Sequence, residues 1–238
     1  MTIPRTTLAS LAVLLAASGV ASAQTAPTAP KPQATTQAAA PPAGGVVLDY
    51  RDKKFRTADP AVAAGDKAKL VAAVAPLKSE AVRALGRDFT VLGHAKGQLA
   101  RQGDVDFYLL SLARPVAAEP FPKSAAQVIV ALKGDEAVAS YTLPADRQYA
   151  RLVGAVDMDG DKTSEVLLEG SGYNMGQLIV ALAAVKLATD GTTSVAQAIP
   201  EVYADSCDNP VGAKTRSAKT LVLQGGKLVE TVHPEKCG

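Results

Sequence analysis

Three β-hairpin patterns constrain the fold more than any other feature of this sequence. In each pattern, two short runs of strand-forming residues flank a turn dipeptide, which is Gly-Asp, Asp-Gly or Gly-Gly. Dipeptides of this kind supply the positive φ angles that tight hairpin turns require. The sequence therefore predicts hairpins at residues 128–143, 185–199 and 220–232, with turns at Gly134-Asp135, Asp190-Gly191 and Gly225-Gly226.

Four further short runs have strand character, and no helical pattern separates them. They lie at residues 89–95, 105–112, 149–156 and 165–170. Since parallel strands need crossover connections, which are usually helices, this order predicts antiparallel pairing. We expect residues 88–238 to form a mostly β domain of antiparallel sheets.

Residues 46–87 are expected to form a helical segment that packs on this β domain. Asp59-Pro60 has the pattern of a helix cap followed by a first-turn proline, and Gly86 is a suitable stop. Pro76 interrupts the pattern, which predicts a kinked helix or two helices. Apolar residues recur at intervals of three or four, which lines one helical face: Leu70, Val74, Leu77, Ala81 and Leu85.

The first 45 residues are expected to lie outside the folded domain. Residues 1–23 combine Arg5, a short apolar run and Ala21-Ser22-Ala23, which is the pattern of a cleaved export signal. Residues 24–45 contain five prolines and no large apolar side chain, which predicts a disordered linker. The mature protein is therefore expected to be secreted or periplasmic, without a transmembrane segment.

Charge and composition narrow the classes of partner. The chain has 25 basic residues, of which Arg5 lies in the export signal, against 23 acidic residues, so the mature balance is nearly neutral. No basic run or basic-aromatic patch points to nucleic acid. Few aromatic residues and no tryptophan weaken the case for a stacking platform for sugars. The expected partner is an unidentified protein or glycan.

Cys207 and Cys237 are the two cysteines of the chain. In an oxidising compartment an even pair indicates a disulfide. A catalytic or metal-binding thiol is the alternative, but neither cysteine has a CxxC partner or a histidine at ligand spacing. We expect a structural disulfide.

The stretch 157-DMDGDKTSE-165 is the strongest candidate for a metal site. Calcium favours several hard oxygen ligands, and a tight loop can supply them from alternate positions. Gly160 permits a sharp turn, whereas Lys162 stands where such loops often have glycine and must take an unfavourable backbone angle unless the loop differs locally. The expected ligands are Asp157, Asp159, Asp161, the carbonyl of Thr163, and Glu165.

Two alternatives to a calcium site remain open for this loop. It would be a solvated acidic turn if the carboxylates splay apart, because converging carboxylates repel one another and raise their own pKa values. Magnesium suits the loop less, since it tends to keep its waters. An EF-hand is not expected, because Leu168 stands where the bidentate glutamate would be.

A weak internal repeat accompanies the acidic loop. Residues 98–110 align without gaps on residues 157–169, 59 positions later, and each copy precedes one of the predicted hairpins. Gln98, Ala100 and Gln102 stand where the second copy has aspartates, so the first copy could not hold a divalent ion. The pattern suggests stacked or radially arranged sheets.

The loop resembles those of FG-GAP or VCBS-type repeats, the calcium-loop blades of integrin-α-like propellers. The resemblance covers about 13 residues, and Lys162 departs from the usual glycine. It implies two or three degenerate blade-like repeats and calcium ligation by Asp157, Asp159, Asp161, Thr163 and Glu165.

No catalytic constellation is recognisable in the sequence. His94 and His233 belong to no nucleophile-base arrangement, and Asp104 and Asp106 are only a carboxylate pair on one expected strand face. The stretch 170-GSGYNMG-176 lacks the spacing of a dinucleotide loop, and is either a surface connection or a partner-binding loop that presents Tyr173 and Asn174.

The expected function is therefore that of a non-catalytic, exported calcium-binding protein with a binding or structural role in the cell envelope. The alternative is a secreted hydrolase or inhibitor-like factor that uses residues 170–176. A deep pocket that gathers Asp104, Asp106 or His94 would favour the alternative.

Overall fold

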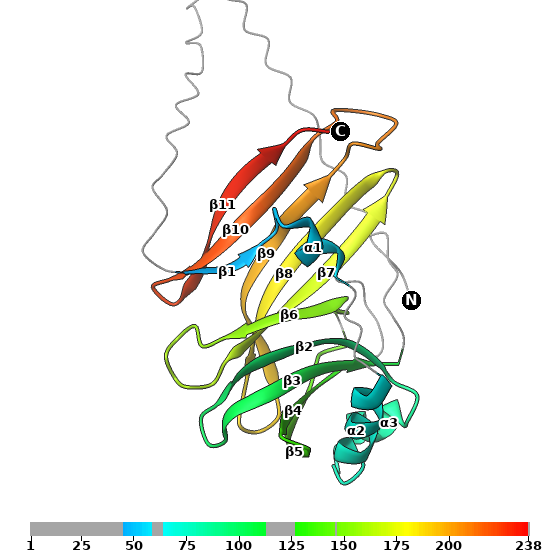
Figure 1. The fold of residues 1–238 in the computed structure, drawn as a ribbon, viewed down its shortest axis with the longest axis vertical. Helices are drawn as coiled ribbons and strands as arrows, with labels where there is room; N and C mark the ends of the chain where they lie inside the picture. The colour runs from blue at the N-terminus through cyan, green and yellow to red at the C-terminus, as the bar shows by residue number, and fades with distance from the viewer. Residues whose placement is uncertain (1–44, 59–63, 113–126, 146, 238) are drawn as a thin grey trace, which may run out of the picture. The chain divides into compact units, whose positions relative to one another are not determined.

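The computed structural model describes residues 45–58, 64–112, 127–145 and 147–237 (Figure 1). These residues belong to the second of two units of the chain, Pro41–Gly238. The predicted export signal, nearly all of the predicted linker and the predicted Asp59-Pro60 cap lie outside the described residues.

The described chain is mostly β, as predicted, with short helices near its start. The helices are α1 (Lys53–Thr57), α2 (Ala64–Val74) and α3 (Glu80–Leu85). The strands are β1 (Val46–Asp49), β2 (Thr90–Leu99), β3 (Gly103–Ser111), β4 (Val128–Lys133), β5 (Glu136–Thr142), β6 (Arg151–Val156), β7 (Glu165–Asn174), β8 (Gln177–Leu187), β9 (Thr193–Asp205), β10 (Arg216–Gln224) and β11 (Lys227–Glu235). The three predicted hairpins are β4–β5, β8–β9 and β10–β11, each with the predicted turn dipeptide.

Most of the sheet consists of two consecutive four-stranded meanders, β2–β5 and β6–β9. Within each meander, every strand pairs antiparallel with the next one along the chain. The two meanders meet through their first strands, β2 and β6, which are parallel at Gly93 and Leu152. The strands thus form one open, largely antiparallel sheet, whereas a stack of separate sheets was expected. The blade-like repeats stay a prediction.

Strand β10 joins the two ends of the described chain. One edge of β10 pairs with β11 along its length. The other edge is divided: Arg216–Ala218 pair with β9, and Thr220–Val222 pair with β1. Figure 1 shows β1 beside β10. The N-terminal strand therefore completes a sheet built by the C-terminal strands.

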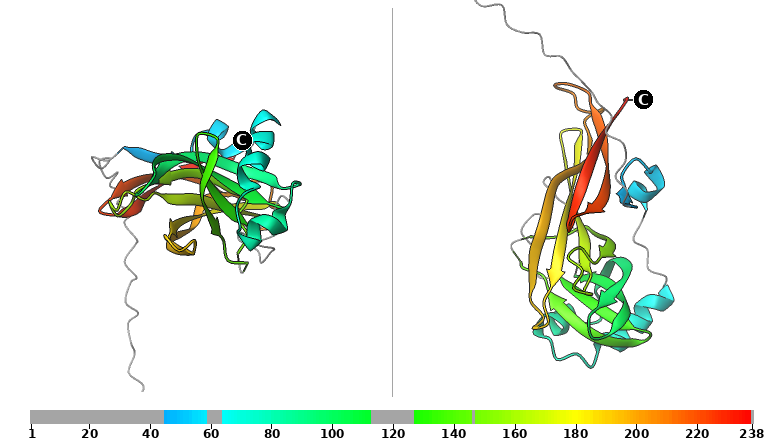
Figure 2. Two further views of the ribbon diagram at one scale, coloured as in Figure 1. Left: turned by 90° about the horizontal axis from the view of Figure 1, so that it is seen from below. Right: turned by 90° about the vertical axis from the view of Figure 1, so that its left-hand side faces the viewer.

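The main hydrophobic core draws on both meanders. Phe107 and Leu109 of β3 are fully buried in it, and so are Val166 and Leu168 of β7. These are the pairs that the internal alignment at a separation of 59 residues superimposes. The two aligned segments therefore occupy corresponding positions, each in the second strand of its meander. Figure 2 shows the two parts of the sheet from two further directions.

Helices α2 and α3 cover the opposite face of β2–β4. Leu70, Val74 and Leu85 are buried in this second cluster, against Val128 and Val130 of β4 and their neighbours. The predicted helical stripe and its division are confirmed, because α2 ends at Val74, just before Pro76. Gly86 ends α3 with a φ of 61°, as its role as a stop requires.

The N-terminal segment 45–58 packs on the outer face of the second meander. The prediction that residues 46–87 are helical is wrong at its start, because Val46–Asp49 is a strand. After β1, Tyr50 is buried and its ring lies edge-on to Phe55 of α1, with centroids 5.3 Å apart. Together with Leu48, these rings pack on a third cluster that includes Leu167 of β7.

A buried polar network fixes this segment to the sheet. Tyr50 donates a hydrogen bond of 2.7 Å to Glu169 of β7, whose side chain Arg151 of β6 holds with two further bonds of 2.8 and 2.9 Å. The same guanidinium donates to the carbonyl of Phe55 at 2.8 Å. Arg56 adds bonds to the Tyr50 carbonyl and to Glu235 of β11.

The predicted disulfide is confirmed. Cys207, just after β9, is bonded to Cys237, just after β11, with their Cα atoms 5.5 Å apart. The bond closes a loop of 30 residues that contains the β10–β11 hairpin. Among the helices that the structure describes, none is long and apolar enough to cross a membrane.

Candidate metal centre

The acidic stretch forms the loop between β6 and β7, at the left of Figure 1. Both flanking strands are fixed by the sheet, and Glu165 is the first residue of β7. Alternation along β7 places Val166 and Leu168 in the main core, so Glu165 and Leu167 face the opposite side. The sheet, rather than the loop, therefore determines where the Glu165 carboxylate lies.

Three of the predicted carboxylates converge. One oxygen each of Asp157, Asp159 and Glu165 lies within 4.8 Å of the others. Glu165 is only 2% exposed, whereas Asp159 lies at the surface. Burial raises the pKa of Glu165, while a backbone hydrogen bond from Met158, 2.8 Å long, favours its ionised form. Such a group of hard oxygens could hold a metal ion.

The backbone of the loop folds around its own carboxylates. Asp157 accepts from the amides of Gly160 and Lys162 at 2.8 and 3.0 Å, and Asp161 accepts from the amide of Thr163 at 2.7 Å. This turn requires positive φ angles of 79° at Gly160 and 67° at Lys162. Lys162 therefore adopts the unfavourable angle that its position predicted.

Lys186 of β8 supplies a positive charge that the sequence interpretation missed. Its ammonium pairs with Asp159 and also lies 3.1 Å from Asp161. The ion pair lowers the pKa of Asp159 and raises that of Lys186. Asp161 is thus directed to Lys186, and among the described residues it is not part of the converging group. The position of Lys186 follows from the strand register, because Val185 pairs with Val166 and Lys186 therefore lies opposite Glu165.

The end of the loop is anchored to the first meander. Ser164 is buried, and its amide donates to the carbonyl of Gln98 at 2.9 Å. Its hydroxyl in turn accepts from the amide of Gln98 at 2.9 Å. Gly97 allows this contact, because a Cβ atom there would lie 3.0 Å from the Ser164 hydroxyl and 2.7 Å from the Phe107 ring. The β2 strand of the first meander therefore supports the acidic loop directly.

A cavity of about 340 Å³ opens beside the carboxylates. Asp159, Glu165 and Lys186 line one side of it. The other side comes from Gln197 of β9 and from the β10–β11 turn, where Lys227 lies. Gln197 is fixed there by two hydrogen bonds to the backbone of Leu228, of 2.8 and 2.9 Å. The candidate centre is therefore accessible from outside the loop.

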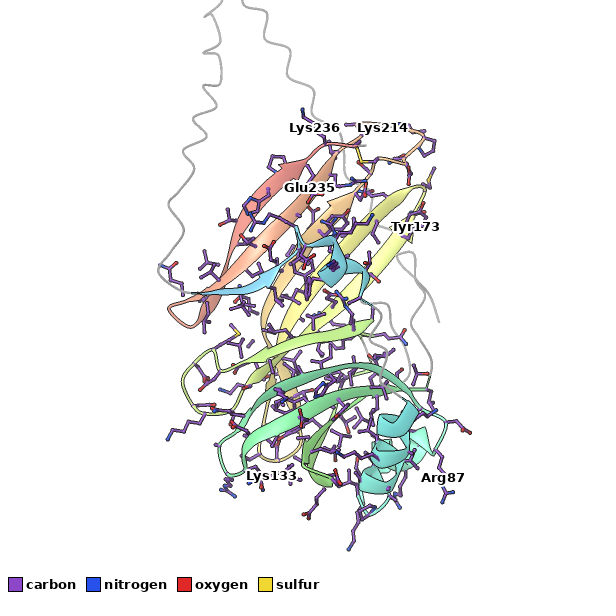
Figure 3. All side chains as sticks on the ribbon, in the orientation of Figure 1. Arg87, Lys133, Tyr173, Lys214, Glu235 and Lys236 are labelled. Atoms are coloured by element: carbon purple, nitrogen blue, oxygen red, sulfur yellow. A yellow bond between two sulfur atoms is a disulfide. The ribbon has the colours of Figure 1, made fainter. Side chains whose placement is uncertain are left out.

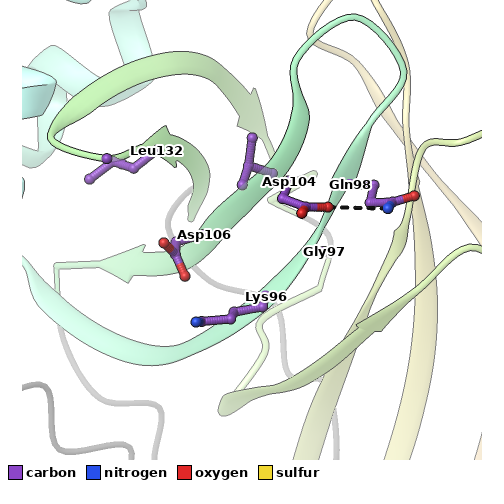
Figure 4. Close-up of a pocket in the computed structure, with 8 residues that line it drawn as sticks. Lys96, Gly97, Gln98, Asp104, Asp106 and Leu132 are labelled. Carbon is purple, nitrogen blue, oxygen red and sulfur yellow. Dashed lines mark hydrogen bonds between the residues drawn. The ribbon is translucent and has the colours of Figure 1, made fainter.

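A second cavity of about 380 Å³ includes Asp104 and Asp106, the other carboxylates weighed from the sequence (Figure 4). Asp104 accepts a hydrogen bond of 3.1 Å from Gln98, and Asp106 lies 2.7 Å from the ring nitrogen of His94. His94 itself stacks on Tyr108 and does not line the cavity. The described lining residues include no serine, threonine or cysteine that could act as a nucleophile.

The predicted partner-binding loop at residues 170–176 is not a loop. Tyr173 and Asn174 are the last residues of β7, and the turn to β8 is Met175-Gly176, with φ angles of 48° and 80°. Tyr173 is exposed at this hairpin tip (Figure 3). Gly176 is packed so closely on Asp208 that a Cβ atom would lie 2.3 Å from its carbonyl oxygen. The tip is therefore held against the loop that carries Cys207.

His233, the other histidine of the chain, lies on β11 with its ring nitrogen 3.0 Å from the hydroxyl of Thr220. This contact joins β10 and β11 and indicates a structural role for His233.

Comparisons with protein-family models, with curated proteins and with solved structures found no match for the chain.

Proposed function

We propose that this chain is an exported, non-catalytic β-protein that binds calcium in the loop between β6 and β7. The observation that carries the proposal is the convergence of Asp157, Asp159 and Glu165 within 4.8 Å. The ion would fix the loop at the rim of the cavity, and its role would be structural or would support binding at the cell envelope.

The chemistry of the donor set supports calcium. All three side chains offer hard oxygens, and calcium accepts more of them, in a more flexible geometry, than magnesium does. Glu165 is buried on a strand end, so it would present its carboxylate without a large entropy cost. The resemblance to FG-GAP or VCBS-type loops adds Asp161 and the Thr163 carbonyl as further ligands.

Calcium should raise the melting temperature, because an ion that binds only the folded state stabilises it by mass action. At a concentration one hundred times the dissociation constant, the gain is about 2.7 kcal/mol. For a domain of this size, that corresponds to about 5–10 °C. The measurement is thermal unfolding of the purified protein in calcium and in chelator, with calorimetric titration of the same sample.

Matched variants separate the loop from general charge effects. Asp159→Asn should abolish the calcium-dependent rise, because it removes one converging carboxylate. Asp190→Asn removes a carboxylate from the β8–β9 turn, where Asp190 accepts from Thr192, and should keep the full rise. A protein that melts at the same temperature in calcium and in chelator, with no heat of binding, would refute the proposed function.

The alternative function, a secreted hydrolase or inhibitor-like factor, receives less support. It relied on a loop at residues 170–176, and these residues form the end of a hairpin. The cavity at Asp104 and Asp106 has no nucleophile among its described lining residues, and His94 lies outside it.

A further inference from the structure

We infer that Lys186 is a tethered counter-ion of the acidic loop, which holds the loop closed without a metal and which a divalent ion must displace. That Lys186 holds the loop closed does not depend on any metal. That a divalent ion displaces Lys186 rests on the proposed calcium site, because it concerns the affinity of that site.

The position of Lys186 is fixed by the sheet. Its neighbours Val185 and Leu187 are buried in the main core, so its side chain points to the opposite face of β8. Glu165 points to that same face, and the pairing of Val166 with Val185 makes Lys186 its cross-strand neighbour. The backbone therefore delivers the ammonium to the mouth of the loop.

The Lys186 ammonium contacts the loop carboxylates as a bound cation would. It bridges Asp159 and Asp161, which are positions 3 and 5 of the acidic stretch. Each of these carboxylates also accepts a backbone amide of the loop, from Asp161 and from Thr163 respectively. Lys186 thus neutralises two of the three aspartates that accept backbone bonds within the loop, and it stabilises the closed conformation.

A divalent ion at the converging group would need Asp159, which Lys186 already holds. Binding would therefore cost the Lys186 contacts, and Asp161 would become free to join the ligands. The expected result is a weak site, with a dissociation constant on the order of 0.1–1 mM, the range of extracellular calcium modules. Lys186 would set the affinity without touching the ion.

The loop can be tested in chelator by amide hydrogen exchange of residues 157–165. Lys186→Met should accelerate exchange of the Asp161 and Thr163 amides about two- to fivefold, because these amides bond to the two carboxylates that Lys186 holds and because partly exposed ion pairs are of modest strength. Lys162→Met is the matched control, because it removes a charge from the same loop, while the side chain of Lys162 forms no ion pair with the described residues. Lys186→Arg keeps the charge and should retain slow exchange.

Calorimetric titration with calcium chloride then tests the competition. Lys186→Met should bind calcium about two- to fivefold more tightly than the wild-type protein and Lys162→Met. Equal amide exchange in Lys186→Met and Lys162→Met would refute the role of Lys186 as a counter-ion of the loop. Equal calcium affinities of the two variants would refute the competition between Lys186 and the ion. If no variant binds calcium but Lys186→Met still loosens the loop, the proposed function fails and the counter-ion stands.

Discussion

Arg151 is predicted to be the most costly single ion-pair residue to remove. It lies on β6, and its guanidinium holds both oxygens of Glu169, which is only 5% exposed. It also donates to the carbonyls of Phe55 and Ala58, at 2.8 and 3.1 Å. Arg151→Met removes all of these bonds while it keeps much of the apolar stem.

The magnitude follows from what the variant leaves behind. Without Arg151, the buried Glu169 carboxylate keeps, among the described side chains, only the hydroxyl of Tyr50 as a hydrogen-bond donor. Breaking a buried ion pair from one side typically costs about 3–5 kcal/mol, because the remaining charge stays desolvated. The pair of Arg216 and Asp205 is the control, because its side chains are 27% and 21% exposed, so that Arg216→Met should cost clearly less than Arg151→Met.

Urea unfolding measures the difference. With a slope of about 2–3 kcal/mol per molar, a loss of 4 kcal/mol lowers the midpoint by about 1.3–2 M. The triple variant Tyr50→Phe, Arg151→Met, Glu169→Leu replaces the whole network with apolar groups and should recover most of the loss. The reasoning is refuted if Arg151→Met costs no more than Arg216→Met, or if the triple variant is less stable than Arg151→Met.

Three further predictions concern other parts of the fold. Replacing Cys207 and Cys237 by serine should lower the free energy of unfolding by about 3.6 kcal/mol, the chain-entropy value for a 30-residue loop, and reduction of the wild-type protein should give the same loss in urea unfolding. Burial and the neighbouring Glu169 raise the pKa of Tyr50 well above its usual range, so its contribution to stability is fully present below pH 10 and is lost as the pH rises further. Tyr50→Phe should therefore cost about 1.5–3 kcal/mol at pH 7, and this deficit relative to wild type should shrink above pH 10; a constant deficit would contradict the assignment. Gly93→Ala should destabilise the protein by about 1–3 kcal/mol at the junction of the meanders, because φ is 142° and the new Cβ would lie 2.3 Å from the Leu152 carbonyl oxygen. Gly154→Ala is the control and should cost less in the same urea assay, because the nearest atom to its Cβ would be 3.4 Å away.

Features decided by neighbouring residues could be predicted from the sequence. The turns at Gly134, Gly191 and Gly225 all take positive φ angles, which glycine adopts without the steric cost that other residues incur. Pro76 divides the helical segment for an equally local reason. The Met175-Gly176 turn was missed because Met175 reaches a φ of 48° without the residue type that usually signals it.

Features decided across the sheet could not be predicted. Val46–Asp49 is too short to show an alternating pattern, and its partners on β10 lie at the other end of the chain. The acidic loop illustrates the same limit. Its spacing identified Asp157, Asp159 and Glu165, but the diversion of Asp161 depends on Lys186 and hence on the register of β7 and β8.

The divided edge of β10 has a consequence for the order in which the chain can fold. The segment of β1 and α1 contacts β10 and β11, and the Arg56–Glu235 bond spans 179 residues. Contacts so distant must overcome a large loop-closure entropy, and such topologies fold slowly. Strand β1 therefore cannot form its native pairing until β10 has been synthesised. A chain cut short before β10 would lose its first strand as well as its last.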